Sequence, residues 1–157
     1  ENLSGILSDI GDKNIPSGRQ LHRGGTYLAM EGPAFSTRAE SNLYRQWGCS
    51  IIGMTNHTEA RLAREAEIAY ASLSMVTDYD CWNQKQEEVS VEMVIENLRV
   101  NTEVANKIVY ETAKIIDVKR PNSKAHHSLK DGLMTSQEKV SNEAKSKVRI
   151  FTDNYWC

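Results

Sequence analysis

The sequence predicts an α/β fold, a three-layer arrangement in which helices flank a mixed, mostly parallel sheet. Three short apolar segments, at 26–30, 49–52 and 70–76, alternate with segments of helical composition. The 157 residues suit one domain with a single core, spanning 1–157. With 39% hydrophobic and 25% charged residues, the composition is that of an ordinary globular protein. The chain begins at Glu1 rather than Met, so we expect the fold to be incomplete.

The first elements follow from apolar spacing and glycine. Apolar residues at 3, 6, 7 and 10 recur at helical spacing and predict a short helix that ends near Gly11. The stretch Thr26 to Met30 predicts a strand, with glycines on both sides. Thr37 and Glu40 have the spacing of a capping box, which predicts a helix from there to Gly48.

The middle of the chain continues the alternation. Residues 49–55 predict a second strand, and the Ala-, Glu- and Arg-rich segment 59–70 predicts a helix. In that helix Leu62, Ala66 and Ala69 are expected to face inward. The run that ends in Asp78-Tyr79-Asp80 predicts the third strand.

The last third of the chain is expected to form a long helix, followed by a tail at the periphery of the fold. Apolar residues at helical spacing predict a long helix from Ser90 to about Ile116. Residues 119–157 are expected to form a peripheral tail, and 136–156 can form another helix that ends in aromatic residues. Those aromatic residues indicate docking, for example onto a neighbouring subunit.

Charge and cysteine usage exclude several classes of protein. The net charge of -2 gives no excess of positive charge for a nucleic-acid partner. No apolar run is long enough to span a bilayer. Cys49, Cys81 and Cys157 are odd in number and lack CxxC spacing, which favours a reducing compartment and a cytoplasmic location.

Ligands of open α/β sheets bind at the carboxyl ends of the strands. Three polar segments follow the predicted strands there, and they contain Phe35, Met54, Thr55, Asp78 and Asp80. Phe35 offers a flat π-face, Met54 a soft apolar wall, and Thr55 a hydroxyl for an anion. Taken singly, each also has an ordinary explanation: Phe35 as a core residue, Met54 as packing, and Thr55 as an N-cap.

The two aspartates pose a separate question. On an extended chain, residues 78 and 80 direct their carboxylates to the same side. Such a pair repels unless water, a cation or a hydrogen-bond donor lies between the two groups. The donor can be the amino edge of a heterocycle, whereas a divalent metal would indicate a metal-dependent transferase.

The stretches "GGTYLAMEGPAFSTRAES", "IIGMTNHTEARLAREAEIAYAS" and "MVTDYDCW" resemble the purine nucleoside phosphorylase family, in the branch that acts on 5′-methylthioadenosine. The resemblance runs from Gly24 to Trp82 and continues more loosely through "HHSLKDGL". It implies phosphorolysis of 5′-methylthioadenosine to adenine and 5-methylthioribose 1-phosphate, in purine and methionine salvage. Inorganic phosphate would be the co-substrate, with no metal or organic cofactor.

The resemblance also implies a role for each candidate residue. Phe35 would pack against adenine, Met54 would contact the ribose, and Thr55 would contribute to the phosphate site. Asp78 and Asp80 would contact the N6 amine and the N7 edge of the base. Asp78 would be the catalytic general acid, a role typically worth about 10²–10⁴-fold in rate.

Two departures from the family pattern leave alternatives open. The resemblance covers only about the C-terminal half of the family, without its Gly-rich phosphate loop and Arg-His segment. A catalytically incomplete chain that keeps a purine-binding surface or a subunit-interaction role is therefore the alternative. Asn56 to Glu59 replace the usual Val-Pro-Glu phrase, so the role of His57 is open. The family pattern implies a homotrimer, in which Leu133 closes a neighbour's pocket.

Overall fold

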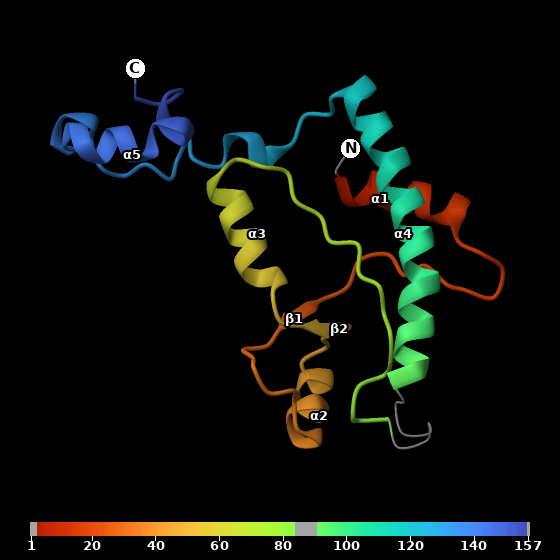
Figure 1. The fold of residues 1–157 in the computed structure, drawn as a ribbon. Coiled ribbons are helices and arrows are strands. Elements are labelled where there is room, and N and C mark those ends of the chain that lie inside the picture. The colour runs from red at the N-terminus through yellow and green to blue at the C-terminus, as the bar shows by residue number, and fades with distance from the viewer. Residues whose placement is uncertain (1–2, 84–90, 157) are drawn as a thin grey trace.

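The computed structural model describes residues 3–83 and 91–156 and confirms the α/β class (Figure 1). The elements are, in chain order, α1 (Leu3–Asn14), β1 (Tyr27–Ala29), α2 (Arg38–Gln46), β2 (Ile51–Gly53), α3 (Asn56–Glu65), α4 (Val91–Lys119), the 3₁₀ helices η1 (Lys124–His127) and η2 (Gln137–Lys139), and α5 (Asn142–Thr152).

The first two strands lie where the sequence predicts them and pair in parallel. Tyr27 is opposite Ile51, and Ala29 is opposite Gly53. Helix α2 connects the two strands, as the crossover of a parallel pair requires. Both strands therefore end at the same edge of the sheet, which is where the predicted site residues follow.

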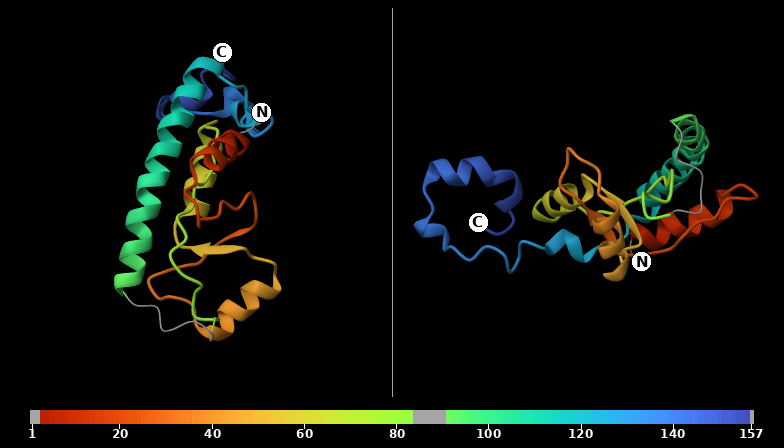
Figure 2. Two further views of the ribbon diagram at one scale, coloured as in Figure 1. Left: turned by 90° about the vertical axis from the view of Figure 1, so that its right-hand side faces the viewer. Right: turned by 90° about the horizontal axis from the view of Figure 1, so that it is seen from below.

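The third predicted strand is wrong for this structure. Residues 71–77 belong to no strand, although they run beside α4 in both Figure 1 and the left view of Figure 2. The Asn101 and Asn97 side chains donate hydrogen bonds to the carbonyls of Val76 and Thr77, at 2.9 and 3.0 Å. A strand needs a neighbouring strand for its backbone groups, and in the described part of the chain this segment has none.

The early helices differ from prediction mainly at their ends. α1 continues three residues past Gly11, which is buried: a Cβ there would lie 2.7 Å from the side chain of Leu21. Gly11 thus allows close packing instead of ending the helix. α2 begins as predicted, with both hydrogen bonds of the Thr37–Glu40 capping box present. These bonds from the backbone amide and hydroxyl of Thr37 hold the pKa of Glu40 below its usual value.

Helix α3 lies earlier in the chain than predicted. It spans 56–65 rather than 59–70, and Glu67 follows in the left-handed region with φ 56°. That conformation cannot continue a right-handed helix. The expected inward position of Leu62 is also wrong, because its side chain is 58% exposed.

The long helix and the C-terminal helix are present with shifted bounds. Ser90, the predicted first residue of the long helix, lies outside the described residues, and α4 extends past Ile116 to Lys119. Arg120 then adopts φ 41°, which ends the helix. α5 covers only 142–152 of the predicted 136–156, because the Ser141 hydroxyl caps it by accepting from the Ala144 amide at 3.2 Å.

The core lies between α1 and α4. Ile6, Ile10 and Ile108 are its buried apolar residues, and the partly buried side chains that pack around them are Leu7, Leu73, Val104 and Ile115. Many other large apolar side chains are exposed. Within the residues that the structure describes, no helix combines the length and apolar character needed to cross a membrane.

The C-terminal arm, residues 135–156, carries η2 and α5. Figure 1 and the right view of Figure 2 show α5 at the far end of the molecule from α4. Its apolar side chains include Ile150, which is 84% exposed. Tyr155 connects the arm to the body, since its hydroxyl donates to the Glu67 carboxylate at 2.5 Å.

Thr112 on α4 gives a test of the core. Its side chain is only 5% exposed, and its hydroxyl finds no hydrogen-bond partner among the described residues. Thr112→Val keeps the shape and removes the unpaired hydroxyl, so it should raise the free energy of unfolding by about 1 kcal/mol. Urea denaturation measures this.

Thr102→Val is the matched control on the same helix. The Thr102 hydroxyl donates to the Leu98 carbonyl at 2.7 Å, so this substitution removes an existing hydrogen bond. We expect no stabilisation from it. Equal effects of the two valine variants would show that the Thr112 hydroxyl carries no such penalty.

Candidate active site

The ends of β1 and β2 bring the first site segments together. The Met30 amide donates to the Gly53 carbonyl at 2.8 Å, so the segments that follow β1 and β2 leave the sheet side by side. The Met54 sulfur then lies against Gly32: a Cβ on that glycine would be 3.1 Å from it. Met54 is 37% exposed, so it packs on the loop after β1 and still presents a face to solvent.

The aspartates lie in a turn instead of on an extended strand. Asp80 has φ 59°, and its amide donates to Asp78 Oδ1 at 2.9 Å. The Thr77 hydroxyl donates to Asp78 Oδ2 at 2.7 Å. The expectation of two carboxylates aligned by strand alternation is therefore wrong, because residues 78–80 lie in no strand and Asp80 itself leaves the extended conformation. We call residues 77–80 the aspartate turn.

Ser41 connects the aspartate turn to helix α2. Its side chain is 2% exposed, and its hydroxyl donates to Asp80 Oδ2. This contact orients the Asp80 carboxylate, while one Asp80 oxygen is left for other donors. Sequence reasoning missed Ser41, because nothing local in the sequence signals a partner 39 residues away.

The loop that carries Phe35 also contacts the aspartate turn. The Cys81 thiol donates to the Ser36 carbonyl at 3.4 Å, and the Ser36 hydroxyl lies 3.1 Å from the Met30 sulfur. Phe35 itself is 84% exposed, which rules out the core interpretation within the described chain. Its ring is free to stack on a flat ligand.

Thr55 stands at the start of α3. It occupies the N-cap position, yet its side chain makes no capping hydrogen bond. The hydroxyl and the first amides of α3 are thus available to an anion, which the helix dipole also favours at this end. Thr55 therefore occupies the N-cap position that the sequence allowed, but its side chain does not form the capping hydrogen bond.

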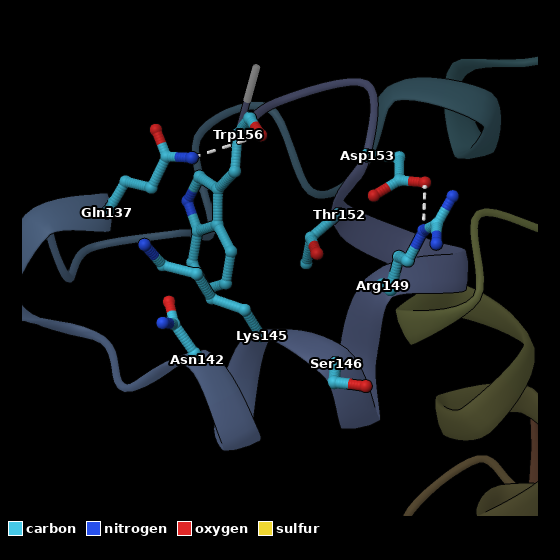
Figure 3. Close-up of a pocket in the computed structure, with 8 residues that line it drawn as sticks. All are labelled: Gln137, Asn142, Lys145, Ser146, Arg149, Thr152, Asp153 and Trp156. Atoms are coloured by element: carbon cyan, nitrogen blue, oxygen red, sulfur yellow. Dashed lines mark hydrogen bonds and ion pairs between the residues drawn. The ribbon is translucent and has the colours of Figure 1, made fainter.

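Two surface cavities lie away from these residues. Figure 3 shows one within the C-terminal arm, where the Gln137 amide donates to the Trp156 carbonyl and Arg149 pairs with Asp153. The other lies along α3 and is lined by His57, Ala60, Arg61, Arg64 and Glu65. The predicted site residues line neither cavity. Phe35 and Met54 among them present exposed side chains to solvent.

Glu67 holds the tail segment that follows α4. Its carboxylate accepts a hydrogen bond from the Tyr155 hydroxyl and another from the Leu129 amide at 3.0 Å. Both bonds lower the pKa of Glu67, and the bond from Tyr155 has the larger effect. Electrostatic interaction with the nearby His127 and His126 side chains adds to this lowering of the Glu67 pKa. The segment 128–133, which contains Leu133, is thereby fixed to the end of α3.

The lowered pKa of Glu67 predicts how this attachment depends on pH. Its ordinary value is 4.5. Because the folded value lies below that of the unfolded chain, the attachment is fully present above pH 4.5 and is lost as the pH falls through the lowered value. The NMR shift of the Leu129 amide should follow this loss. Glu67→Gln should abolish the titration, and an unchanged titration in that variant would exclude Glu67 as its origin.

Parallel strands with polar segments at their carboxyl ends are the arrangement in which open α/β sheets bind ligands. A family model described as the phosphorylase superfamily matches residues 4–114, and the chain belongs to this superfamily. It is similar to the S-methyl-5′-thioadenosine phosphorylase of Prochlorococcus marinus, with 64% identity over 154 residues that cover 98% of this chain and 49% of the relative. The corresponding protein of Thermosynechococcus vestitus is 52% identical, with 98% and 53% covered.

Solved structures give the same relationship. A methylthioadenosine phosphorylase from an antarctic soil metagenomic library superposes with a TM-score of 0.88 at 42% identity, over 95% of this chain and 52% of that one. The methylthioadenosine phosphorylase of Schistosoma mansoni in complex with adenine has a TM-score of 0.66 at 30% identity, over 88% and 53%. The chain thus spans about half the length of the relatives it matches.

Proposed function

We propose that this chain provides the purine-binding side of an active site that cleaves 5′-methylthioadenosine with inorganic phosphate. Adenine and 5-methylthioribose 1-phosphate are the products. The observation that carries the proposal is the meeting of three segments at one sheet edge: the Phe35 loop, Met54 and the aspartate turn. The names of the similar proteins support the same substrate.

In this reaction a phosphate oxygen bonds to the anomeric carbon of the ribose as the bond from that carbon to adenine breaks. The electron pair of the broken bond moves onto the purine. Asp78 donates a proton to N7, so that adenine leaves as a neutral base and Asp78 becomes a carboxylate. Asp80 accepts from the N6 amine, with its carboxylate held by Ser41.

The other candidate residues position the substrate. Phe35 stacks on adenine with its exposed ring, and Met54 contacts the ribose. Thr55 and the first amides of α3 bind the phosphate, which acts as co-substrate without an organic cofactor. A phosphate site needs several converging donors, so the remaining ones belong to the part of the phosphorylase fold outside this chain. A homotrimer with Leu133 beside a neighbour's site is part of the same proposal.

An assay of adenine release from 5′-methylthioadenosine tests the proposal. The chain is measured alone and after co-expression with the half of the Prochlorococcus relative that it does not match. Each sample is assayed with and without phosphate, and with either a chelator or a divalent metal added. Phosphate-dependent release in the co-expressed sample supports the proposal. Stabilisation by adenine without release in either sample supports a purine-binding chain without catalysis, and release that needs a divalent metal supports a metal-dependent transferase.

A further inference from the structure

Ser41 is a buried polar residue of α2 whose hydroxyl contacts the aspartate turn. Its side chain is 2% exposed, so water does not reach it as an alternative partner. A serine within a helix can donate to the carbonyl four residues earlier, which for Ser41 is that of Thr37. In this structure the Thr37 carbonyl accepts from the Ser41 amide at 3.0 Å, and the Ser41 hydroxyl donates to Asp80 Oδ2. Because a buried donor without a partner costs free energy, the hydroxyl depends on the Asp80 carboxylate.

The position of Ser41 is fixed by the start of α2. In the capping box, the Thr37 amide donates to Glu40 Oε2 at 2.7 Å, and the Glu40 amide donates to the Thr37 hydroxyl at 3.3 Å. These bonds set where the first helical turn begins, and Ser41 lies at the end of that turn. Ser41 therefore approaches the aspartate turn from a capped helix and not from a loop.

Arg45 makes a second contact between α2 and this part of the chain. Residues 41 and 45 are four apart and so lie on the same side of the helix. The guanidinium carbon of Arg45 lies 3.5 Å from the centre of the Trp82 ring, a cation–π contact. Trp82 in turn meets Tyr79 edge to face, with ring centres 6.1 Å apart. One side of α2 therefore contacts the chain at Asp80 and again two residues later.

The Ser41 contact distinguishes the two oxygens of Asp80. Oδ2 accepts from the Ser41 hydroxyl, whereas no described residue, in 3–83 or 91–156, donates to Oδ1. The backbone of Asp80 is held as well, because its amide donates to Asp78 Oδ1 at 2.9 Å. With its backbone and one oxygen fixed, Asp80 offers its own Oδ1 as the acceptor for a ligand.

We propose that Ser41 is a positioning residue that sets the base preference of the site through Asp80. Its role rests on the proposed binding of adenine at the aspartate turn. The hydroxyl that donates to Oδ2 holds the carboxylate so that Oδ1, an acceptor, meets the 6-position of the purine. The N6 amine of adenine donates to this oxygen, whereas the 6-oxo group of hypoxanthine would place two acceptors together.

Binding of the free bases tests this role without catalysis. Adenine and hypoxanthine are titrated by calorimetry into the chain alone and into the co-expressed sample, for the parent and for each variant. We expect the parent to bind adenine more tightly than hypoxanthine. Ser41→Ala should reduce the ratio of the two affinities about 10-fold, because the Asp80 carboxylate is then free to turn. A parent that binds adenine without releasing it from the nucleoside would contradict only the proposed reaction.

Asp80→Asn reports the orientation directly, because it replaces one carboxylate oxygen by an NH₂ group. Ser41 is a donor and should hold the remaining oxygen, which leaves the NH₂ group to donate to a 6-oxo group. The preference should then reverse in favour of hypoxanthine. Adding Ser41→Ala should remove about 10-fold of that reversed preference, since the amide can then lie either way round. The two substitutions are thus expected to be non-additive, as for residues in contact.

Two alanine variants are the controls for Ser41→Ala. Arg45→Ala removes the other contact of α2 but keeps the Ser41 hydroxyl, so it should weaken both bases by the same factor and leave their ratio unchanged. Ser72→Ala removes an exposed hydroxyl that lies 3.2 Å from the Ser74 hydroxyl, and it should leave both affinities unchanged.

Circular dichroism checks that each variant folds like the parent. If Ser41→Ala does not, Ser41→Cys takes its place, because a thiol is close to a hydroxyl in size and donates only weakly. We expect it to change the affinity ratio in the same direction by a smaller factor.

The proposal is overturned if the parent binds neither base or binds both equally, or if loss of the Ser41 hydroxyl leaves the affinity ratio unchanged. Equal changes of that ratio in Ser41→Ala and Arg45→Ala would also overturn it, because they would show that α2 only anchors the turn. The same holds if the double variant keeps the full hypoxanthine preference of Asp80→Asn.

Discussion

Asp78→Asn is expected to lower kcat for phosphate-dependent adenine release by about 10²–10⁴-fold. An amide cannot donate the carboxyl proton to N7, so the electron pair of the broken bond is no longer neutralised on the leaving base. The turn should survive the change, because the Asn oxygen can still accept from the Asp80 amide, which lies 2.9 Å from Asp78 Oδ1. Steady-state kinetics of adenine release in the co-expressed sample measure the effect.

Asp80→Asn is the control for Asp78→Asn. Asp80 is proposed to bind the N6 amine without transferring a proton, so its substitution should raise KM more than it lowers kcat. Comparing an aminopurine with a 6-oxopurine nucleoside adds a readout that general unfolding would not change: Asp80→Asn, whose amide can donate to a 6-oxo group, should shift the preference toward the oxopurine. Unchanged kinetics in Asp78→Asn would remove this residue from the mechanism.

Ile108→Ala is expected to destabilise the chain by about 2–5 kcal/mol, the largest stability effect among the substitutions considered. Ile108 is 2% exposed and packs between α4 and the α1 residues Ile6 and Ile10. The structure buries few other apolar residues, so little else can compensate for the cavity. Because whole domains are stable by only about 5–15 kcal/mol, this loss should be visible as a large fall in the urea midpoint.

Val109→Ala is the neighbouring control for that measurement. Val109 is 54% exposed on the same helix, so its truncation removes little buried surface. Its effect on unfolding should stay within about 0.5 kcal/mol. Similar losses at 108 and 109 would mean that the contact between α1 and α4 does not hold the core together.

The local elements could be predicted because their causes lie within a few residues. The Thr37–Glu40 capping box is complete within one helical turn, and the structure contains both of its hydrogen bonds. The strands at 27–29 and 51–53 follow from short apolar runs bounded by turn residues. Errors at the helix ends, such as the continuation of α1 past Gly11, arose where a distant side chain decided the packing.

The candidate site was predictable only in part. Residue types and their position after the strands indicated a ligand at the carboxyl edge of the sheet. The departure of Asp80 from the extended conformation was not predictable, because a strand and a turn of the same sequence differ in whether a partner strand is present. Nor was Ser41, whose contact with Asp80 joins a helix to a loop far along the chain.

By itself, the sequence determined the α/β class, the start of α2, and the residue chemistry that resembles a nucleoside phosphorylase. The tertiary structure alone decided that segment 71–77 lies beside α4 with no partner strand among the described residues, that Ser41 holds Asp80, and that Glu67 joins Leu129 to Tyr155. The physical reason is the distance along the sequence over which each kind of interaction acts. Propensity and capping act over one or two turns of chain, whereas strand pairing and buried hydrogen bonds depend on partners that only the folded chain brings together.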